Sequence, residues 1–354
     1  MITGTPLVRQ PPAWQQELAH AVTDPAELVR LLGLDRSLIE PARAAAHRFG
    51  LRVPRGYVAR MRPGDPTDPL LRQVLPLATE NVAAPDFSLD PVGDLSSMAV
   101  PGVLHKYEGR VLLTITGACA VHCRYCFRRH FPYANANPAS EQWGAALAYI
   151  ATDPSIREVI LSGGDPLTLA DDKLAGLSCR LNDIAHLERV RIHTRLPIVL
   201  PTRVTRELCR TIRVSRLRVV IVVHANHANE VVTDVATALH DLRDAGAMLL
   251  NQSVLLAGVN DNADALCALS ERLFATGVLP YYLHLLDRVQ GAAHFDVDHA
   301  RAEHLWRDMA ARLPGYLVPR LVREVAGAAY KLPFPIEWNP LDDSTATIGY
   351  KTSE

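Results

Sequence analysis

The sequence lacks any uninterrupted apolar run of about 18 residues, the length that a membrane-spanning helix requires. It also lacks an excess of charge of either sign, since 37 lysines and arginines stand against 38 aspartates and glutamates. The opening stretch MITGTPLVRQPPAWQQ has no apolar core of signal-peptide length. We therefore expect a soluble, cytoplasmic protein with neither a membrane nor a nucleic acid as partner.

Cysteine is scarce, with six in 354 residues, and its spacing is uneven. Such a content does not support a disulfide framework in an intracellular chain of this size. Three of the cysteines, Cys119, Cys123 and Cys126, nevertheless lie within eight residues, whereas the other three are scattered through segments with helical spacing. The cluster of three therefore needs a chemical explanation.

Short β-rich segments alternate with helical patterns from residue 110 onward. This alternation predicts an α/β fold with a parallel sheet. Six such units are fewer than the eight of a closed barrel, so we expect a partial (β/α)6 barrel with the chemistry on loops that follow strand ends. The segment 315–334 contains one further candidate strand. The six predicted strands are 111–116, 158–162, 190–194, 218–223, 248–256 and 280–286.

The N-terminal part of the chain has a different pattern. Its first half has helical spacing, and residues 62–102 are rich in proline, aspartate and glycine. We expect this irregular segment to wrap around the main domain. The predicted organisation is an N-terminal helical and irregular region at 1–100, the barrel at 101–331 and a C-terminal tail at 332–354.

The three clustered cysteines have the spacing C-x3-C-x2-C and follow the first predicted strand. Three thiolates on one loop can bind three irons of a [4Fe–4S] cluster and leave the fourth iron open, whereas an electron carrier normally has four cysteines. The alternative is a structural zinc site with His122 or His130 as the fourth ligand, although such sites usually consist of two separated ligand pairs. The spacing favours the cluster.

The cysteine loop, with Tyr125 before its last cysteine, resembles the radical S-adenosylmethionine superfamily. The Gly163-Gly164-Asp165-Pro166 turn after the second predicted strand strengthens the likeness. The phrases CRYCFRRHFPY, RVPRGY and LHLLDRVQGAAHF further resemble the lysine 2,3-aminomutase family, over about residues 50–331. Within that family they are most similar to the shorter bacterial type that makes (R)-β-lysine for modifying elongation factor P.

The resemblance implies pyridoxal 5′-phosphate as a second cofactor, attached covalently to Lys331. Without the resemblance, Lys331 in the stretch AGAAYK would be taken for a surface lysine. The family pattern places the coenzyme phosphate at Tyr107 and Arg110, with Lys106 in place of an arginine. Longer relatives have a glycine-rich run before this lysine, where this chain has Gly327-Ala-Ala-Tyr330.

The resemblance also assigns the substrate contacts. Arg128 is expected to hold the substrate carboxylate, since a guanidinium can bond both oxygens. Asp287 and Glu324 are expected to hold the side-chain ammonium, because a buried charge needs a partner. Glu324 replaces the aspartate of longer relatives. The contacts expected for S-adenosylmethionine are Gly163, Gly164, Asp165, His193, Arg195, His227, Asn251 and Gln252.

The implied activity is migration of the lysine amino group from C2 to C3 by a radical mechanism. It requires an electron donor, and a ligase acting on elongation factor P is an expected partner for the product. One alternative is an aminomutase for arginine, ornithine or glutamate, of which glutamate is disfavoured by two acidic contacts. The other is a non-catalytic iron–sulfur or zinc protein.

Overall fold

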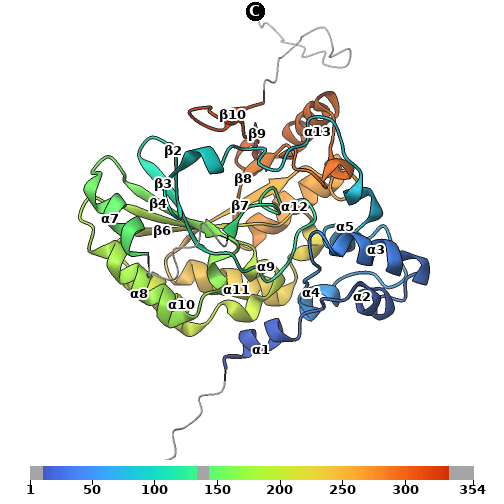
Figure 1. Cartoon of the computed structure of the whole chain (residues 1–354), viewed down its shortest axis with the longest axis horizontal. Coiled ribbons are helices and arrows are strands. Elements are labelled where there is room, and N and C mark those ends of the chain that lie inside the picture. The colour runs from blue at the N-terminus through green and yellow to red at the C-terminus, as the bar shows by residue number, and fades with distance from the viewer. Residues whose placement is uncertain (1–10, 134–142, 335–354) are drawn as a thin grey trace, which may run out of the picture.

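The computed structural model describes residues 11–133 and 143–334. The strands form one sheet and are β1 (Met98–Val100), β2 (Val103–Tyr107), β3 (Arg110–Thr116), β4 (Glu158–Gly163), β5 (Arg189–Thr194), β6 (Arg218–Val223), β7 (Met248–Val254), β8 (Leu279–His284), β9 (Arg320–Arg323) and β10 (Leu332–Pro333). They pair in chain order, with β1 and β10 at opposite edges, so the sheet is not closed (Figure 1). The expected open α/β fold is therefore confirmed.

Strands β3 to β9 are parallel to one another, and they include all six predicted strands and the candidate seventh. The sequence argument missed β1, β2 and β10, which are antiparallel. Both β1 and β2 lie at the end of, or just beyond, the segment expected to be irregular. They are short and joined by a tight turn at Gly102, whose φ is +83°. β1 pairs with β2 and β2 pairs with β3, so their stability comes from this pairing and not from a pattern of their own.

Helices connect the parallel strands and cover the outer side of the sheet (Figure 1). In α8, Leu174, Leu177 and Leu181 recur every three or four residues and form the buried stripe. Thr205, Asn262 and Asp298 cap three of the helices with their side chains. These connecting helices are α7 (Gly144–Thr152), α8 (Asp171–Asn182), α9 (Leu196–Val199), α10 (Arg206–Val214), α11 (Thr233–Asp244), α12 (Ala263–Ala275) and α13 (His299–Arg312).

The N-terminal helices gather at one side of the sheet, in blue in Figure 1. They are α1 (Ala13–Ala19), α2 (Pro25–Leu31), α3 (Ile39–Ala46), α4 (Arg55–Val58) and α5 (Pro69–Arg72). Asp24 and Pro25 begin α2, and the Asp24 carboxylate accepts the Ala26 amide. Trp14 and Leu70 share one hydrophobic core with Leu161 of β4. The N-terminal region therefore packs against the sheet.

Short 3-10 turns connect many of these elements and carry several of the side chains that surround the site. They are η1 (Arg36–Leu38), η2 (Ala78–Asn81), η3 (Leu95–Ser97), η5 (Pro166–Thr168), η6 (Pro201–Arg203), η7 (Ala228–Glu230), η8 (Ala293–Phe295) and η9 (Gly315–Leu317).

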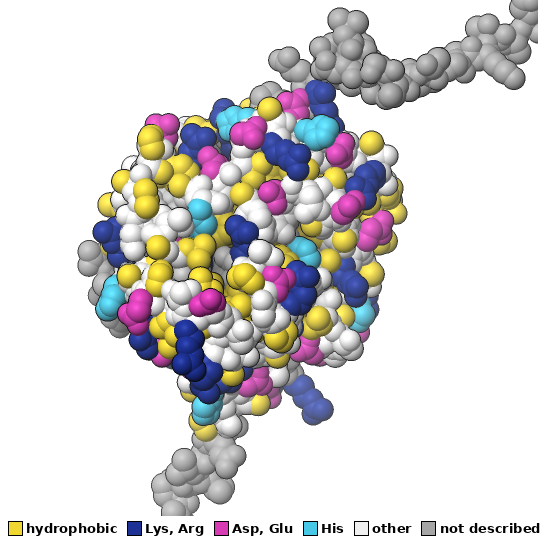
Figure 2. Space-filling model, turned by 90° about the vertical axis from the view of Figure 1, so that its right-hand side faces the viewer, with side chains coloured by type: hydrophobic (Ala, Val, Ile, Leu, Met, Phe, Trp, Pro, Cys, Tyr) yellow, Lys and Arg dark blue, Asp and Glu magenta, His cyan; other side chains and the backbone are white. Residues whose placement is uncertain are grey.

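The surface carries mixed charge. Figure 2 shows basic and acidic side chains interspersed over one face, in agreement with the formal net charge of −1. In the part of the chain that the structure describes, no helix has the length and apolar character needed to cross a bilayer. The tail predicted at 332–354 lies largely outside the described residues. The start of the helical pattern that leads into α7 also lies outside them.

Candidate active site

A cavity of about 660 Å³ opens at the carboxyl ends of the parallel strands. Its lining includes Cys119, Cys123 and Cys126, which follow β3, and it extends to Lys331 beside β10. All six cysteines of the chain are free thiols. Burial raises the pKa of the Cys126 thiol to about 11, and the neighbouring Cys123 raises it further. Binding of metal to this loop therefore displaces protons from the thiols.

Two buried arginines of the cysteine loop form ion pairs and hydrogen bonds with the N-terminal region. Arg124 forms a bidentate ion pair with Glu80, with Nε 2.8 Å from Oε1, and Arg129 Nη2 lies 2.7 Å from Glu80 Oε2. Arg124 also donates to the backbone carbonyl of Phe49 at 2.8 Å. A buried carboxylate shared by two guanidiniums satisfies charges that would be costly if left unpaired. These contacts determine the position of the loop relative to the N-terminal region.

Gly163 and Gly164 lie against the backbone of the cysteine loop. The Gly164 amide donates to the Thr116 carbonyl at 2.7 Å, and the Asp165 amide donates to the Ala118 carbonyl at 2.7 Å. A Cβ atom on Gly163 would lie 2.4 Å from the Thr116 oxygen, and one on Gly164 would lie 2.3 Å from the Ala118 oxygen. The glycines are required for this close packing between two loops, a need that the sequence argument did not include.

We expect Gly164→Ala to destabilise the apoprotein by about 2 kcal/mol, because the added methyl group overpacks a site bounded by backbone. The Gly164→Ala variant should also take up less iron, since the displaced atoms belong to the cysteine loop. Denaturant unfolding and iron content after reconstitution measure the two effects.

Gly176→Ala is the matched control for this substitution. Gly176 lies inside α8, and a Cβ there meets nothing within 4 Å. Alanine should stabilise that helix by about 0.5–1 kcal/mol. Equal stability of the Gly164→Ala variant and the unaltered protein would contradict the packing argument.

Asp94 links the residue expected to bind the substrate carboxylate to one expected to bind the coenzyme phosphate. Its Oδ2 accepts from Arg128 Nε at 2.7 Å, and its Oδ1 lies 2.6 Å from Lys106 Nζ. Arg128 Nη1 also donates to Ser162 Oγ at 2.9 Å. Burial alone would raise the pKa of Asp94, but the two cations outweigh it and hold the pKa below its usual value. No motif in the sequence identified Asp94.

Lys331, Glu324 and Tyr107 meet in the same cavity beside Lys106, whose Nζ lies 3.9 Å from Glu324 Oε1. Lys331 Nζ lies 2.5 Å from Glu324 Oε2, and the Tyr107 hydroxyl donates to Glu324 Oε1. Arg110 lies over the Tyr107 ring at 4.6 Å from its centroid. These expected site residues come from two segments that are distant in sequence, and β2, β3, β9 and β10 bring the segments together.

Asp287, which follows β8, lines the cavity as well. Burial raises the pKa of its carboxyl to about 7, although Lys331 pulls it down. Between its ordinary pKa of 3.8 and about 7 the folded protein therefore holds a proton that the unfolded chain has lost. The linkage makes the folded state less stable as pH rises through this interval.

We expect Asp287→Asn to stabilise the apoprotein, with a larger gain at pH 8 than at pH 5, because the amide never acquires the buried charge. Denaturant unfolding at the two pH values measures the difference. Asp183→Asn is the control, since Asp183 is exposed at the end of α8 and should give the same small effect at both pH values. A gain that does not depend on pH would contradict the raised pKa.

Three histidines line the cavity at or near the ends of three of the parallel strands. His193 belongs to β5, His224 follows β6, and His284 ends β8. Each has a buried Nε2 atom without a hydrogen-bond partner among the described residues. Burial lowers the pKa of His224 to about 4, so its ring is neutral near pH 7. Of these, the sequence argument found only His193; the positions of the other two at strand ends were the available signal.

Most, but not all, of the expected site residues line this cavity. Asn251 is buried between strands and bonds the backbone of Ala225 through both of its amide atoms. His227 instead caps η7, where its Nδ1 accepts the Asn229 amide at 3.2 Å. Both side chains lie outside the lining. The expected residues within it are Cys119, Cys123, Cys126, Lys106, Tyr107, Arg110, Arg128, Gly163, Gly164, Asp165, His193, Arg195, Gln252, Asp287, Glu324 and Lys331.

The Asp165 carboxylate forms hydrogen bonds with other groups of the protein. Its Oδ1 accepts from Thr194 Oγ1 at 2.7 Å, and its Oδ2 accepts the Arg195 amide at 2.7 Å. The carboxylate thereby joins the loop after β4 to the loop after β5. Burial raises the pKa of Asp165 to about 6 against these hydrogen bonds. Its expected contact to S-adenosylmethionine remains a prediction.

The residues present fit the implied cofactors. Three thiols converge on one cavity, the histidine Nε2 atoms leave hydrogen-bonding capacity unused there, and a lysine stands among cations suited to a phosphate. The volume of about 660 Å³ lies within the range of small-molecule sites, about 300–1,000 Å³. The fold and this site define a radical S-adenosylmethionine enzyme, and the model of the Radical SAM superfamily matches residues 113–263.

Comparison with known proteins narrows the class. The L-lysine 2,3-aminomutase of Escherichia coli K12 is 50% identical over 325 residues, which cover 92% of this chain and 95% of that protein. The L-lysine 2,3-aminomutase of Haemophilus influenzae is 47% identical over 92% of this chain and 96% of its own length. That of Clostridium subterminale is 34% identical over 90% and 77%, respectively. The chain belongs to the L-lysine 2,3-aminomutase family.

Proposed function

We propose that the protein converts L-α-lysine to (R)-β-lysine. The observation that carries this proposal is the placement of Arg128, Asp287 and Lys331 in the cavity that also contains the three clustered cysteines. An anion site, two carboxylates and a lysine suit a substrate with one carboxylate and two amino groups. When bound, the [4Fe–4S] cluster and S-adenosylmethionine supply a carbon radical, and pyridoxal phosphate carries the migrating amino group.

Arg128 would bind the substrate carboxylate. Its Nε and Nη1 already donate to Asp94 and Ser162, which fix the plane of the guanidinium. Ionic contact to Asp94 also partly neutralises Arg128, so the site selects a carboxylate by geometry as well as by charge. Asp94 would in addition keep Lys106 oriented toward the coenzyme phosphate.

Glu324 would change partners as the site fills. In this structure its carboxylate pairs with the Lys331 ammonium at 2.5 Å. If Lys331 holds the coenzyme, its nitrogen would no longer be a free ammonium, and Glu324 would lose this ionic partner. The carboxylate is then available, together with Asp287, for the side-chain ammonium of the substrate. The side-chain ammonium of bound lysine would thus give the Glu324 carboxylate a cationic partner again, in place of the Lys331 ammonium.

Anaerobic reconstitution with iron and sulfide tests this function. The protein is then incubated with L-lysine, S-adenosylmethionine, pyridoxal phosphate and a low-potential reductant, and β-lysine is quantified. Its absence with an intact cluster would overturn the proposal. Parallel incubations with arginine, ornithine and glutamate test the related aminomutases, and we expect glutamate to fail because Asp287 and Glu324 repel its side chain.

We also propose that the product is passed to a ligase that acts on elongation factor P, and that both proteins act in the cytoplasm with a cellular electron donor. The support is the similarity of the cysteine segment to the shorter bacterial family members. Mass spectrometry of elongation factor P from cells with and without this chain tests it. An unchanged mass, with active enzyme present, would refute this use of the product.

A further inference from the structure

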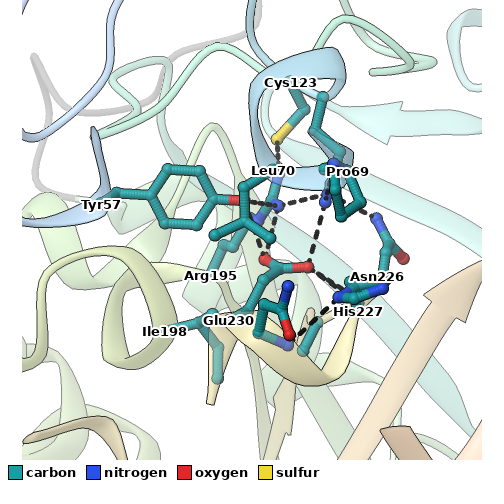
Figure 3. Close-up of polar contacts among 12 residues, drawn as sticks. Tyr57, Pro69, Leu70, Cys123, Arg195, Ile198, Asn226, His227 and Glu230 are labelled. Carbon is teal, nitrogen blue, oxygen red and sulfur yellow. Dashed lines mark hydrogen bonds and ion pairs between the residues drawn. The ribbon is translucent and has the colours of Figure 1, made fainter. Parts of the chain in front are cut away.

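Arg195, directly after β5, places its guanidinium between a cysteine of the cluster loop and a buried carboxylate (Figure 3). Its Nη1 donates to Cys123 Sγ at 2.8 Å, and its Nη2 lies 2.8 Å from Glu230 Oε2. Only about 5% of Arg195 is exposed, and Glu230 is fully buried. This is a charge-assisted hydrogen bond to a cluster ligand, made in an environment from which water is excluded.

The same guanidinium is held by side chains from the N-terminal region. Arg195 Nη2 also donates to Gln73 Oε1 at 2.6 Å and to the Tyr57 hydroxyl at 3.2 Å. Tyr57 belongs to α4 and Gln73 follows α5, whereas Arg195 directly follows strand β5 of the sheet. Three acceptors on one nitrogen leave the guanidinium little freedom to rotate. The position of Nη1 against Cys123 is therefore determined by the packing of the two regions.

Glu230 is fixed as firmly as the arginine. Its Oε1 accepts the backbone amides of Asn226 and His227 at 2.8 and 3.0 Å, and the side chain of Gln73 at 3.2 Å. The resulting ion pair balances the positive charge of Arg195. The electrostatic effect of Arg195 on its surroundings is thus chiefly that of the hydrogen donated to sulfur, and not that of an unpaired cation.

Hydrogen bonds to the sulfurs of an iron–sulfur cluster are among the factors that set its reduction potential. Reduction adds negative charge that is shared with the sulfur ligands, so a donor stabilises the reduced form more than the oxidised form. We propose that Arg195 is a positioning residue that raises the reduction potential of the cluster through its hydrogen bond to Cys123, with Glu230 and Gln73 holding it in place. This inference rests on the proposed function only for the presence of the cluster.

Arg195→Lys tests the inference, because lysine keeps the charge but cannot bond Cys123 and Glu230 at once as the forked guanidinium does. The potential is measured on reconstituted protein by electron paramagnetic resonance at successive potentials, without S-adenosylmethionine or lysine. We expect the ratio of reduced to oxidised cluster at a given potential to fall about tenfold, which is ~59 mV for a one-electron couple.

Arg203→Lys is the matched control. Arg203 is also fully buried near the strand ends, but it bonds the Leu167 and Leu169 carbonyls and Asp171, with no contact to a cysteine. Its replacement removes a buried guanidinium and should leave the potential unchanged. A wild-type potential in a cluster-loaded Arg195→Lys variant, or an equal shift in both variants, would overturn the inference.

Tyr57→Phe provides a milder test if the lysine variant does not take up a cluster. It removes one of the three anchors of Nη2, so a smaller shift in the same direction is expected. Electron–nuclear double resonance on the unaltered protein with its cluster reduced provides a third test. The Nη1 hydrogen should appear there as an exchangeable proton that is magnetically coupled to the cluster. Absence of that coupling would overturn the inference, whereas failure of the unaltered protein to bind a cluster would overturn the proposed function.

Discussion

Cys123→Ala is expected to leave the chain without a stable cluster and without cleavage of S-adenosylmethionine. Three thiolates are the fewest that hold a cubane with one open iron, and the remaining two cannot complete it. The substitution also removes the sulfur that faces Arg195 Nη1, which leaves a buried cationic donor without one of its partners. Iron content after anaerobic reconstitution should fall from about four per chain to background.

The control for this prediction is Cys179→Ala. Cys179 is an exposed free thiol on α8 and does not line the cavity. Its variant should bind iron and cleave S-adenosylmethionine as the unaltered protein does. Retention of a full cluster by Cys123→Ala would mean that the three cysteines are not the ligands, and would favour a different metal site on this loop.

Lys331→Ala is expected to abolish β-lysine formation and to remove the absorbance of covalently bound coenzyme after desalting. The Lys331 amine is close to its carboxylate partner Glu324 and to Tyr107 and Lys106, where the coenzyme phosphate is expected. No general acid or base replaces a missing covalent attachment point. Bound pyridoxal phosphate should therefore fall from about one per chain to near zero, while the iron content is maintained.

Two further lysine variants distinguish covalent attachment of the coenzyme from the mere presence of a positive charge near it. Lys106→Ala removes a cation that pairs with Asp94, and it should weaken coenzyme binding but keep the absorbance at saturating coenzyme. Lys173→Ala, on the outer helix α8, should change neither the binding of the coenzyme nor its absorbance. If the absorbance persists in Lys331→Ala and disappears in Lys106→Ala, then Lys106 is the attachment site.

Asp94 illustrates what sequence patterns could not predict. It lies in a segment rich in proline, aspartate and glycine, with no periodicity to distinguish it from Asp86 or Asp90. Its importance comes from η3 and β2, which bring it between Arg128 and Lys106. His224 and His227 are three residues apart after the same strand, and only the path of the backbone decides that His224 lines the cavity and His227 does not.

The sequence alone determined the class of fold and the chemistry of the cysteine loop. Both depend on local properties: the alternation of strand and helix patterns, and the spacing of Cys119, Cys123 and Cys126, which lie within a few residues of one another. Tertiary structure alone decided the surroundings of that loop. Tyr57, Gln73, Arg195 and Glu230 come from separate parts of the chain, and nothing in their local sequence records that they meet. Their meeting depends on how the N-terminal region packs against the sheet, because long-range packing determines which side chains share a buried site.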